Sequence, residues 1–442
     1  MLRGIFAIFV AFLIGTAPSL ADQRVMLARS AVLLNGPWQF HTGDDPAWKK
    51  PSLDDSKWES VNLAPLAGAH DGDVGLTNYV AGWAARAHKG YKGFAWYRLT
   101  VNVKSLSDKE FALVGPADVD TVYQIYFNGR FIGSDGDFSR SPPTVISVQP
   151  HLFPLPRADW SVSGDEWRGV IAIRVWCRAA PPPDAGGIHI APWLGTAQGA
   201  SAQYHLQWIE KFDGYVVDAT EGLGFLLLAV MALSLVPFDR TDSFYRWLAA
   251  GLVLLAAVRG NQAVYFWSQS ETLTEYIIVH YVLGDPLLLG LWTMTWRACF
   301  GLRNERWTAA ATLALTAICM LGQILSLSML TGVVPHLLAV TAAYALAWGR
   351  LAFLLLFAGF FIRGLRSRGR SDWLALFVML LLLVGLYATE LSGIGIPGIW
   401  FPFGVGVSRT EYAYAALDVV LFMYLLQRLW RYAPRGSVTP AV

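Results

Sequence analysis

Residues 221–237 read EGLGFLLLAVMALSLVP, and this stretch divides the chain into two parts of different chemistry. From Glu221 onward the sequence carries 15 Arg and no Lys, spread between long apolar segments. Before it, acidic and basic residues are mixed as in an aqueous domain. The averages over 442 residues, 55% hydrophobic and 15% charged, therefore combine a polar first part with a lipid-compatible second part. These averages exclude an ordinary cytosolic globule and a disordered chain.

Apolar windows of about 19 residues predict seven transmembrane helices after this boundary. They lie at 221–237, 246–267, 276–297, 307–330, 335–362, 373–393 and 411–430. If the first helix enters from outside, the inner loops and tail hold 12 Arg, and the outer loops hold only Arg409. This bias agrees with the positive-inside rule. Six or eight spans would place the tail outside and translocate an Arg cluster, so we expect seven.

The first 21 residues predict a secretory signal peptide. Arg3 precedes an apolar run from Ile5 to Ile14, and Pro18–Ala21 supplies the small residues that a signal peptidase reads. An uncleaved anchor helix is the alternative, although the run is shorter than the roughly 20 residues that cross a bilayer. Either way, the domain that follows is expected outside the cytoplasm. Only Cys177 of the three cysteines lies in it, so no intrachain disulfide is expected there.

Short β-strand patterns fill the segment 24–200. Runs rich in β-branched and aromatic residues, such as Trp96–Val103 and Val170–Trp176, are bounded by Gly, Pro and Asp. Asn128-Gly129 between two such runs is a strong hairpin signal. The pattern predicts an all-β sandwich of the jelly-roll type. The expected domains are a signal peptide (1–21), an extracytoplasmic β-sandwich (22–200), an amphipathic connector (201–220), an all-α seven-helix transmembrane bundle (221–432) and a short cytoplasmic tail (433–442).

Four motifs occur in a familiar order in the first part. They are Leu34–Phe40 (LNGPWQF), Asp54–Trp58 (DDSKW), Gly93–Arg98 (GFAWYR) and Val122–Arg130 (VYQIYFNGR). Together they resemble the sugar-binding, galactose-binding-like jelly roll at the start of family 2 glycoside hydrolases. The resemblance implies the fold. It stops before the catalytic barrel of that family, whose two acid residues have no counterpart here, so it does not imply hydrolysis.

An exported jelly roll followed by seven spans resembles the bacterial seven-transmembrane receptors with diverse intracellular signalling modules. This resemblance covers Leu34 to Arg431 and rests on architecture and topology. In that family a diguanylate cyclase, histidine kinase or phosphatase usually follows the last span, whereas eleven residues follow Arg431 here. It therefore implies a signal passed to a separate protein, a fragment of a split receptor, or a module that is not a receptor.

The ligand-binding candidates are polar and aromatic residues of predicted loops. In a sugar site an aromatic ring stacks on the sugar face while a nearby carboxylate or Arg bonds the hydroxyl groups. Plain packing or a solvated loop is the alternative for each candidate. The candidates are Trp83, His88, Tyr91, Asp118, Asp120, Arg178, His189 and Trp193.

A second set of candidates lies inside the predicted spans: Arg259, His280, Asp285, Arg350, Glu390 and Asp418. A charge at the centre of a membrane helix costs about 2.5–3.5 kcal/mol, so partners are expected. We predict that Arg259 or Arg350 pairs with Asp285, Glu390 or Asp418. The cluster either repacks when ligand binds, as a coupling lock, or is a static ion pair that holds the bundle. Asp285-Pro286 is also expected to interrupt the third span.

The sequence contains no His-Glu-x-x-His, Gly-x-Ser-x-Gly, Gly-x-x-x-x-Gly-Lys-Ser/Thr or Cys-x-x-Cys motif. We therefore predict no enzyme, no catalytic residue, no metal site and no cofactor. A net charge of +2 gives no basic field for nucleic acid. Seven spans with breaks near Asp285 and past Ile396 do not divide into two matching halves, which disfavours a transporter.

The expected function is a multi-pass receptor of the cell inner membrane. Its jelly roll would bind a small molecule or glycan outside, and its bundle would pass the signal to a cytoplasmic signalling protein. The alternative is a non-signalling carbohydrate-binding or envelope-scaffold membrane protein.

Overall fold

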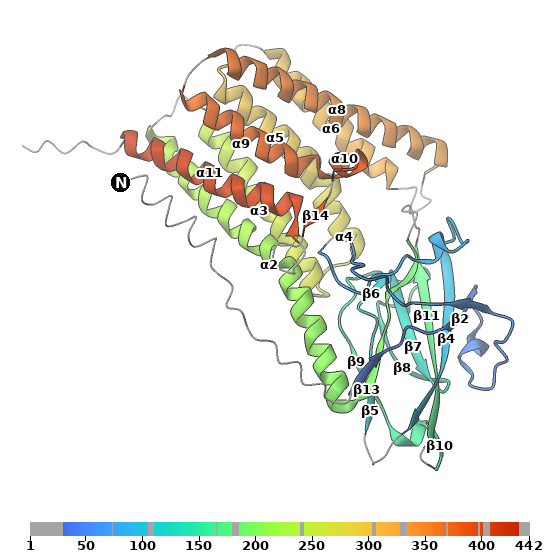
Figure 1. Ribbon diagram of the computed structural model, residues 1–442. Helices are drawn as coiled ribbons and strands as arrows, with labels where there is room; N and C mark the ends of the chain where they lie inside the picture. Colours follow the sequence, from blue (N-terminus) through green and yellow to red (C-terminus); the bar gives the residue numbers. More distant parts are fainter. Residues whose placement is uncertain are drawn as a thin grey trace, which may run out of the picture.

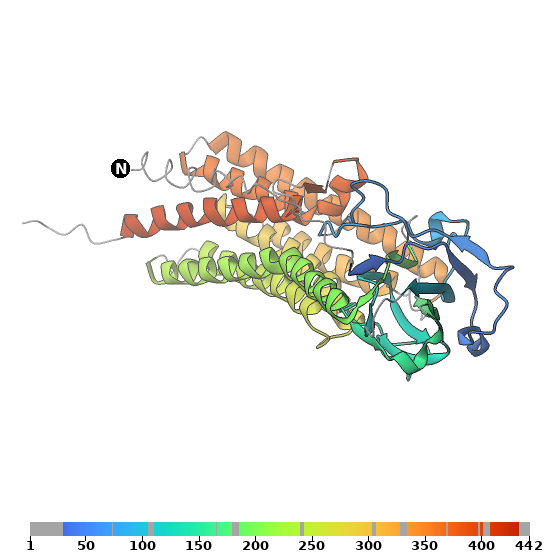
Figure 2. The same cartoon turned by 60° about the horizontal axis from the view of Figure 1, so that its bottom comes forward.

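The computed structural model describes residues 30–432 except 73, 105–109, 165, 179–184, 239–242, 303–305, 328–333, 368–369, 397 and 401–406. The expected signal peptide and cytoplasmic tail therefore lie outside the described residues. The first part of the chain folds into β-sheets and the second into a bundle of helices beside them (Figure 1). Turning the molecule shows the helices running side by side away from the sandwich (Figure 2).

The larger sheet is built around its two longest strands, β4 (Gly93–Lys104) and β11 (Glu166–Cys177). They pair antiparallel over their whole lengths, from Gly93 opposite Cys177 to Lys104 opposite Glu166. Residues 170–173 of β11 (VIAI) are buried, which suits β-branched side chains on a packed sheet. The other strands are β3 (Glu59–Val61), β2 (Trp38–Thr42), β7 (Val122–Phe127), β8 (Arg130–Asp135) and β10 (Ser161–Ser163), in the order β3-β2-β4-β11-β7-β8 with β10 on β11.

The smaller sheet has the order β1-β13-β5-β9 and closes the sandwich. Its strands are β1 (Ala31–Leu33), β13 (Trp193–Thr196), β5 (Phe111–Val114) and β9 (Leu152–Leu155), and a separate pair joins β6 (Asp118–Asp120) to β12 (Gly187–Ile190). Trp38 is completely buried in the core, and Trp83 is 2% exposed. The structure therefore has the two-sheet sandwich expected from the strand patterns, and Trp38 and Trp83 fill the space between the sheets.

The predicted hairpin joins β7 to β8. Asn128 and Gly129 have φ of 46° and 83°, the left-handed values that a tight two-residue turn requires. The Asn128 side chain also holds the turn to its neighbours, because it donates to the Asp159 carbonyl at 2.5 Å and accepts from the Val170 N–H at 2.8 Å. The hairpin prediction is confirmed.

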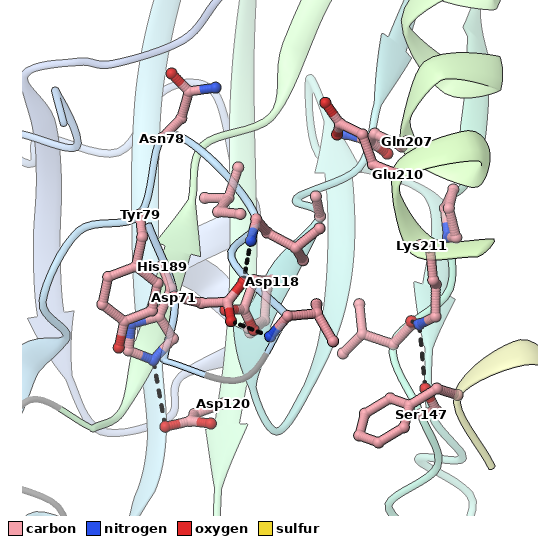
Figure 3. A pocket seen from close by; sticks show the side chains of 18 of the residues that line it. Asp71, Asn78, Tyr79, Asp118, Asp120, Ser147, His189, Gln207, Glu210 and Lys211 are labelled. Atoms are coloured by element: carbon pink, nitrogen blue, oxygen red, sulfur yellow. Dashed lines mark hydrogen bonds and ion pairs between the residues drawn. The ribbon is translucent and has the colours of Figure 1, made fainter. Parts of the chain in front are cut away.

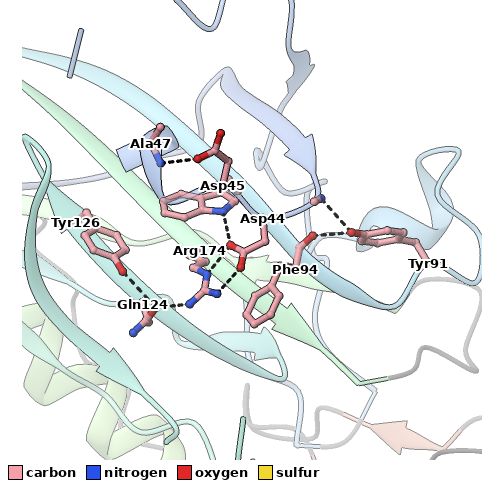
Figure 4. Close-up of polar contacts among 10 residues, drawn as sticks. Asp44, Asp45, Ala47, Tyr91, Phe94, Gln124, Tyr126 and Arg174 are labelled. Carbon is pink, nitrogen blue, oxygen red and sulfur yellow. Dashed lines mark hydrogen bonds and ion pairs between the residues drawn. The ribbon is translucent and has the colours of Figure 1, made fainter. Parts of the chain in front are cut away.

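The outer face of the larger sheet carries a polar network (Figure 4) beside a small apolar cluster that includes Val122, Val145 and Trp176. Arg174 of β11 forms an ion pair with Asp44, with Nη2 2.5 Å from Oδ2, and its Nη1 donates to Gln124 of β7. Trp96 donates its indole N–H to the same Asp44 at 3.2 Å. The network ties the loop after β2 to the centre of the sheet.

Helices make up the second part of the chain. They are α2 (Ala197–Leu235), α3 (Phe244–Trp267), α4 (Leu273–Ile277), the π-helical η5 (Ile278–Gly284), α5 (Asp285–Cys299), α6 (Arg306–Ser326), α8 (His336–Ser367), α9 (Arg370–Leu386), α10 (Ala388–Gly393) and α11 (Arg409–Tyr432). Among the described residues, six helical segments are long and apolar enough to cross a membrane: Ala197–Phe238, Phe244–Trp267, Leu273–Cys299, Arg306–Ser326, His336–Arg366 and Arg409–Arg431.

The predicted sixth span, 373–393, differs from the others. The helix ends at Leu386 and a separate α10 begins at Ala388, so the apolar segment Trp373–Leu386 is shorter than the six. Tyr387 marks the break with non-helical φ and ψ of −111° and 28°, and its hydroxyl donates to the Arg350 carbonyl on α8. The described part of the chain thus contains six full-length candidate spans and one shorter apolar helix.

The expected connector, 201–220, lies within α2, which runs unbroken from the last strand of the sandwich into the bundle. One expectation about helix continuity requires correction. The expected interruption at Asp285-Pro286 does not occur. The Asp285 N–H bonds the His280 carbonyl, and the five-residue π spacing carries the helix past Pro286, which occupies the first turn of α5.

Candidate ligand-binding site

A cavity of about 770 Å³ lies where the sandwich meets the helices, within the size range of small-molecule sites (Figure 3). Four groups of residues line it. They are the loop 71–79, strands β6 and β12, the segment 145–150, and the facing parts of α2, α3 and α4. Clefts between two structural parts are common ligand sites because both parts contribute polar groups to them.

The walls of the cavity are fixed by contacts between the two parts. Gln149 of the sandwich donates to the carbonyls of Phe266 and Ser268 at the end of α3, at 3.2 and 3.3 Å. Tyr215 of α2 stacks on Phe266 with ring centroids 3.9 Å apart. The Leu273 N–H, at the start of α4, donates to the Val145 carbonyl at 2.9 Å. The sandwich and the first helices are therefore packed together and not merely tethered.

His189 and Asp120 form a charged pair on the sandwich side. The β6–β12 ladder shifts register between Ile188 and Ile190, and His189 occupies that bulge. Its Nε2 lies 3.2 Å from Asp120 Oδ2, its Nδ1 lies 2.9 Å from the Val80 carbonyl, and its ring stacks on Tyr79. Since both ring nitrogens face acceptors, the imidazolium form satisfies both contacts.

The pKa values of this pair agree with the geometry. Burial opposes the charge on His189, but Asp120, Asp118 and the Val80 carbonyl outweigh it and raise the pKa of His189 to about 9. Burial likewise opposes the charge on Asp120, and the hydrogen bonds from His189 and the Gly186 N–H still lower the pKa of Asp120. The pair is therefore ionised at neutral pH.

Asp118 lies two residues before Asp120 on β6 and has a different environment. Burial raises the pKa of Asp118 to about 6, an effect that His189 opposes and that Asp120 and Asp71 reinforce. Asp71 itself is 7% exposed, and its carboxylate accepts the backbone N–H groups of Val74, Gly75 and Leu76, which shapes the loop. Asp118 is thus a half-buried carboxylate that has no ion pair among the described residues, while Asp71 mainly holds the wall of the cavity.

The substitution Asp118→Asn is expected to stabilise the protein at pH 7–8. The folded pKa is raised from 3.8, so protonated Asp118 favours folding below pH 3.8 and that contribution is lost as pH rises through about 6. The variant lacks this loss, so thermal unfolding midpoints of variant and wild type should coincide below pH 4 and separate above pH 6. Glu166→Gln, an exposed change on β11, is the control. A variant less stable than wild type at pH 7–8 would contradict this account.

The helical side of the cavity carries Gln207, Glu210 and Lys211, spaced so that they share one face of α2. Lys211 Nζ donates to Ser147 Oγ at 3.1 Å and to the Val148 carbonyl, which bonds α2 to the sandwich. Gln207 is 6% exposed, and its Nε2 donates to the Gly115 carbonyl at 3.4 Å. The sequence alone placed these residues in the connector, so it did not identify them as site residues.

The structure brings four of the eight predicted ligand residues to this cavity: Asp118, Asp120, His189 and Trp193. The other four lie elsewhere. Trp83 is in the sandwich core, and His88 pairs with Glu59 at 2.7 Å. The Tyr91 hydroxyl donates to the Phe94 carbonyl and accepts the Gly43 N–H (Figure 4), and Arg178 follows β11 outside the cavity lining.

The intramembrane candidates form two groups of ion pairs. Arg350 Nε lies 2.5 Å from Glu390 Oε1, and Arg350 Nη1 lies 3.9 Å from Asp285 Oδ2, so Arg350 has two of the predicted partners. Arg259 has different partners from those predicted. Its Nη2 lies 2.5 Å from Asp218 and 2.9 Å from Glu221, which are three residues apart on α2.

His280 and Asp418 join neither group by an ion pair within the described residues. The His280 ring packs on Tyr276 and Tyr281. Asp418 of α11 lies against Gly224 of α2, where a Cβ would come within 2.5 Å of Asp418 Oδ2. Gly224 therefore makes room for this carboxylate. In the same described part of the chain, no three His, Cys, Asp or Glu side chains are arranged to hold a metal ion.

Comparisons with known proteins find a likeness for the sandwich only. No family model and no curated protein matches the sequence. Solved structures of family 2 glycoside hydrolases match in part. The β-glucuronidase 2 of Bacteroides uniformis is 21% identical with a TM-score of 0.27, a family 2 member from Bacteroides cellulosilyticus 20% with 0.26, and a β-glycosidase from Bacteroides vulgatus 20% with 0.25.

These matches cover 37–38% of this chain and 18–20% of the enzyme chains. The enzymes belong to the family that the four sequence motifs resemble. What they act on is not carried over to this chain, because the likeness is partial and the identity is low.

Proposed function

We propose that this protein is a membrane receptor that binds a small molecule or glycan in the junction cavity and signals through its helices. One observation carries the proposal: the cavity is lined by both parts of the chain, and α2 continues from the cavity into the bundle. A ligand that contacts Gln207, Glu210 or Lys211 acts directly on the first helix. A ligand that binds more tightly when α2 is in one position than in another shifts the equilibrium between the two positions.

The proposed topology has seven spans, counting the shorter α9 with the six longer helices. The sandwich lies outside the cytoplasm, and α11 ends inside the cell, where a separate signalling protein receives the output. The Arg-rich inner loops and the single Arg409 outside support this orientation. We also propose that the protein is not an enzyme, because the described site has ligand-binding groups without an assembled nucleophile and base.

The test uses the full-length protein in membrane vesicles, with Arg366→Cys as a labelling site at the exposed inner end of α8. Glucose, glucuronate, glucosamine and N-acetylglucosamine are screened by thermal shift, and a binding sugar is expected to change the labelling rate of the introduced thiol by at least about two-fold. The softened-helix variant Ala219→Gly with Thr220→Gly should bind the same sugar with a smaller labelling change. Ala309→Gly with Ala310→Gly, in α6, is the matched control.

If a sugar binds and the labelling rate stays constant, the receptor proposal is wrong. The protein would then be a carbohydrate-binding or scaffold membrane protein that does not signal.

A further inference from the structure

The charged groups that donate hydrogen bonds at the cavity already have partners. Lys211 directs two N–H groups to Ser147 and Val148. His189 directs its two ring nitrogens to Asp120 and Val80. These groups hold the walls together, so they have little to offer an acceptor on a ligand. A ligand rich in carboxylate or phosphate oxygens would have to displace existing contacts, and each such exchange costs free energy.

Several hydrogen-bond acceptors that line the cavity, by contrast, have no partner among the described residues. Gln207 is 94% buried, and within the described residues its Oε1 accepts no hydrogen bond. A buried polar atom of this kind normally has a partner, so the unfilled acceptor itself points to a missing donor. Asp118 and Glu210 also line the cavity without a hydrogen bond or ion pair in the described part of the chain. In Figure 3, Asp118 lies between the Tyr79–His189 pair and the side chains of α2.

The charges and aromatic rings of the cavity lining indicate which kind of hydrogen-bond-donating ligand fits. Among the described residues that line the cavity, the charged ones are Asp71, Asp118, Asp120 and Glu210, opposed by His189 and Lys211. Because His189 is committed to Asp120, the remaining balance is negative. Aromatic rings complete the lining, and their faces attract cations. They are Tyr79, Trp193, Tyr215, Tyr265, Phe266 and Tyr276.

We propose that the cavity binds its ligand through a protonated amine, which donates to Asp118, Glu210 and Gln207 Oε1 and packs against the aromatic lining. This inference rests on the proposed function and names the chemical class of the ligand. An amino sugar with a free amine fits it, and so does an aromatic amine. An N-acetylated or hydroxyl analogue lacks the charge and has fewer donors, so it should bind more weakly.

The experiment compares matched probes on the full-length protein in detergent micelles by isothermal titration at pH 7.5. The pairs are glucosamine with N-acetylglucosamine, and 2-phenylethylamine with 2-phenylethanol. At least one amine is expected to bind about ten-fold or more tightly than its neutral partner, the effect of one charge-assisted hydrogen bond. If no amine binds more tightly than its partner, the proposed ligand class is wrong.

Two variants locate the effect. Asp118→Asn is expected to weaken amine binding about ten-fold while leaving the neutral partner's affinity nearly unchanged. Glu166→Gln, which removes an exposed carboxylate outside the cavity lining, should leave both affinities unchanged. Equal weakening by the two variants would show a long-range charge effect and overturn the assignment to this cavity.

The outcomes separate this inference from the receptor proposal. Tight binding of a neutral sugar with a change in thiol labelling of the Arg366→Cys protein would refute the amine and keep the receptor. Selective amine binding without a labelling change would keep the amine and refute signalling.

Discussion

Arg259→Ala is expected to lower the free energy of unfolding by about 3–5 kcal/mol, because it leaves two buried carboxylates without their cation. Arg259, Asp218 and Glu221 are 6%, 1% and 4% exposed. Arg259 Nη2 lies within 2.9 Å of both carboxylates, and its guanidinium also faces the Tyr414 ring at 5.5 Å. The measurement is the thermal unfolding midpoint in detergent micelles.

Two further variants test whether charge is the cause. Arg246→Ala removes an exposed Arg from the same helix and should change the midpoint little. The triple variant Arg259→Met, Asp218→Asn, Glu221→Gln removes all three charges and is expected to recover most of the loss. If the triple variant is no more stable than Arg259→Ala, the lost packing of Arg259 explains the destabilisation and the ion-pair account is wrong.

His189→Gln is expected to remove a stabilisation of about 3 kcal/mol at pH 6, since the folded pKa of about 9 stands well above the ordinary value of 6.5. The sign follows from the raised pKa. The stabilisation is fully present below pH 6.5 and is lost as pH rises through about 9. The wild-type free energy of unfolding should therefore fall between pH 6.5 and 9.5, whereas the variant lacks this component.

The control is His88→Gln, which breaks the pair with Glu59 at the surface of the sandwich. Its expected effect is about 1 kcal/mol or less, because exposed pairs are screened by solvent. The comparison uses differences between variant and wild type at each pH, so that groups titrating in every protein cancel. Parallel curves for wild type and His189→Gln from pH 6.5 to 9.5 would show that His189 is neutral in the folded state.

Local pattern predicted most of the sandwich, because strand alternation and the Asn128-Gly129 turn are short-range signals. It predicted less of the site. Asp118, Asp120, His189 and Trp193 were found as polar or aromatic loop residues, but Gln207 and Lys211 were not. Nothing near them in sequence shows that one face of α2 meets the segment 145–150 of the sandwich. That contact is a product of tertiary packing.

Tertiary packing also explains why the partners of Arg259 differ from those predicted. Burial of an Arg predicts an acidic partner, but it does not say which helix supplies it. Asp218 lies in the expected connector and Glu221 is the first residue of the first predicted span, and neither is among the candidates predicted inside the spans. Their spacing of three on a helix continuous with the first span was the available signal. The length of the sixth span was missed for another reason, since hydropathy does not register the break at Tyr387.

The unbroken α2 has a mechanical consequence. At 1.5 Å per residue, the middle of the Asp218–Glu221 attachment lies roughly 13 Å from Lys211 and roughly 23 Å from Leu235. If Arg259 holds α2 at that attachment while the helix tilts as a stiff rod, the helix acts as a lever with unequal arms. A sideways shift of about 1 Å at the cavity then becomes a shift of about 2 Å, in the opposite direction, at Leu235.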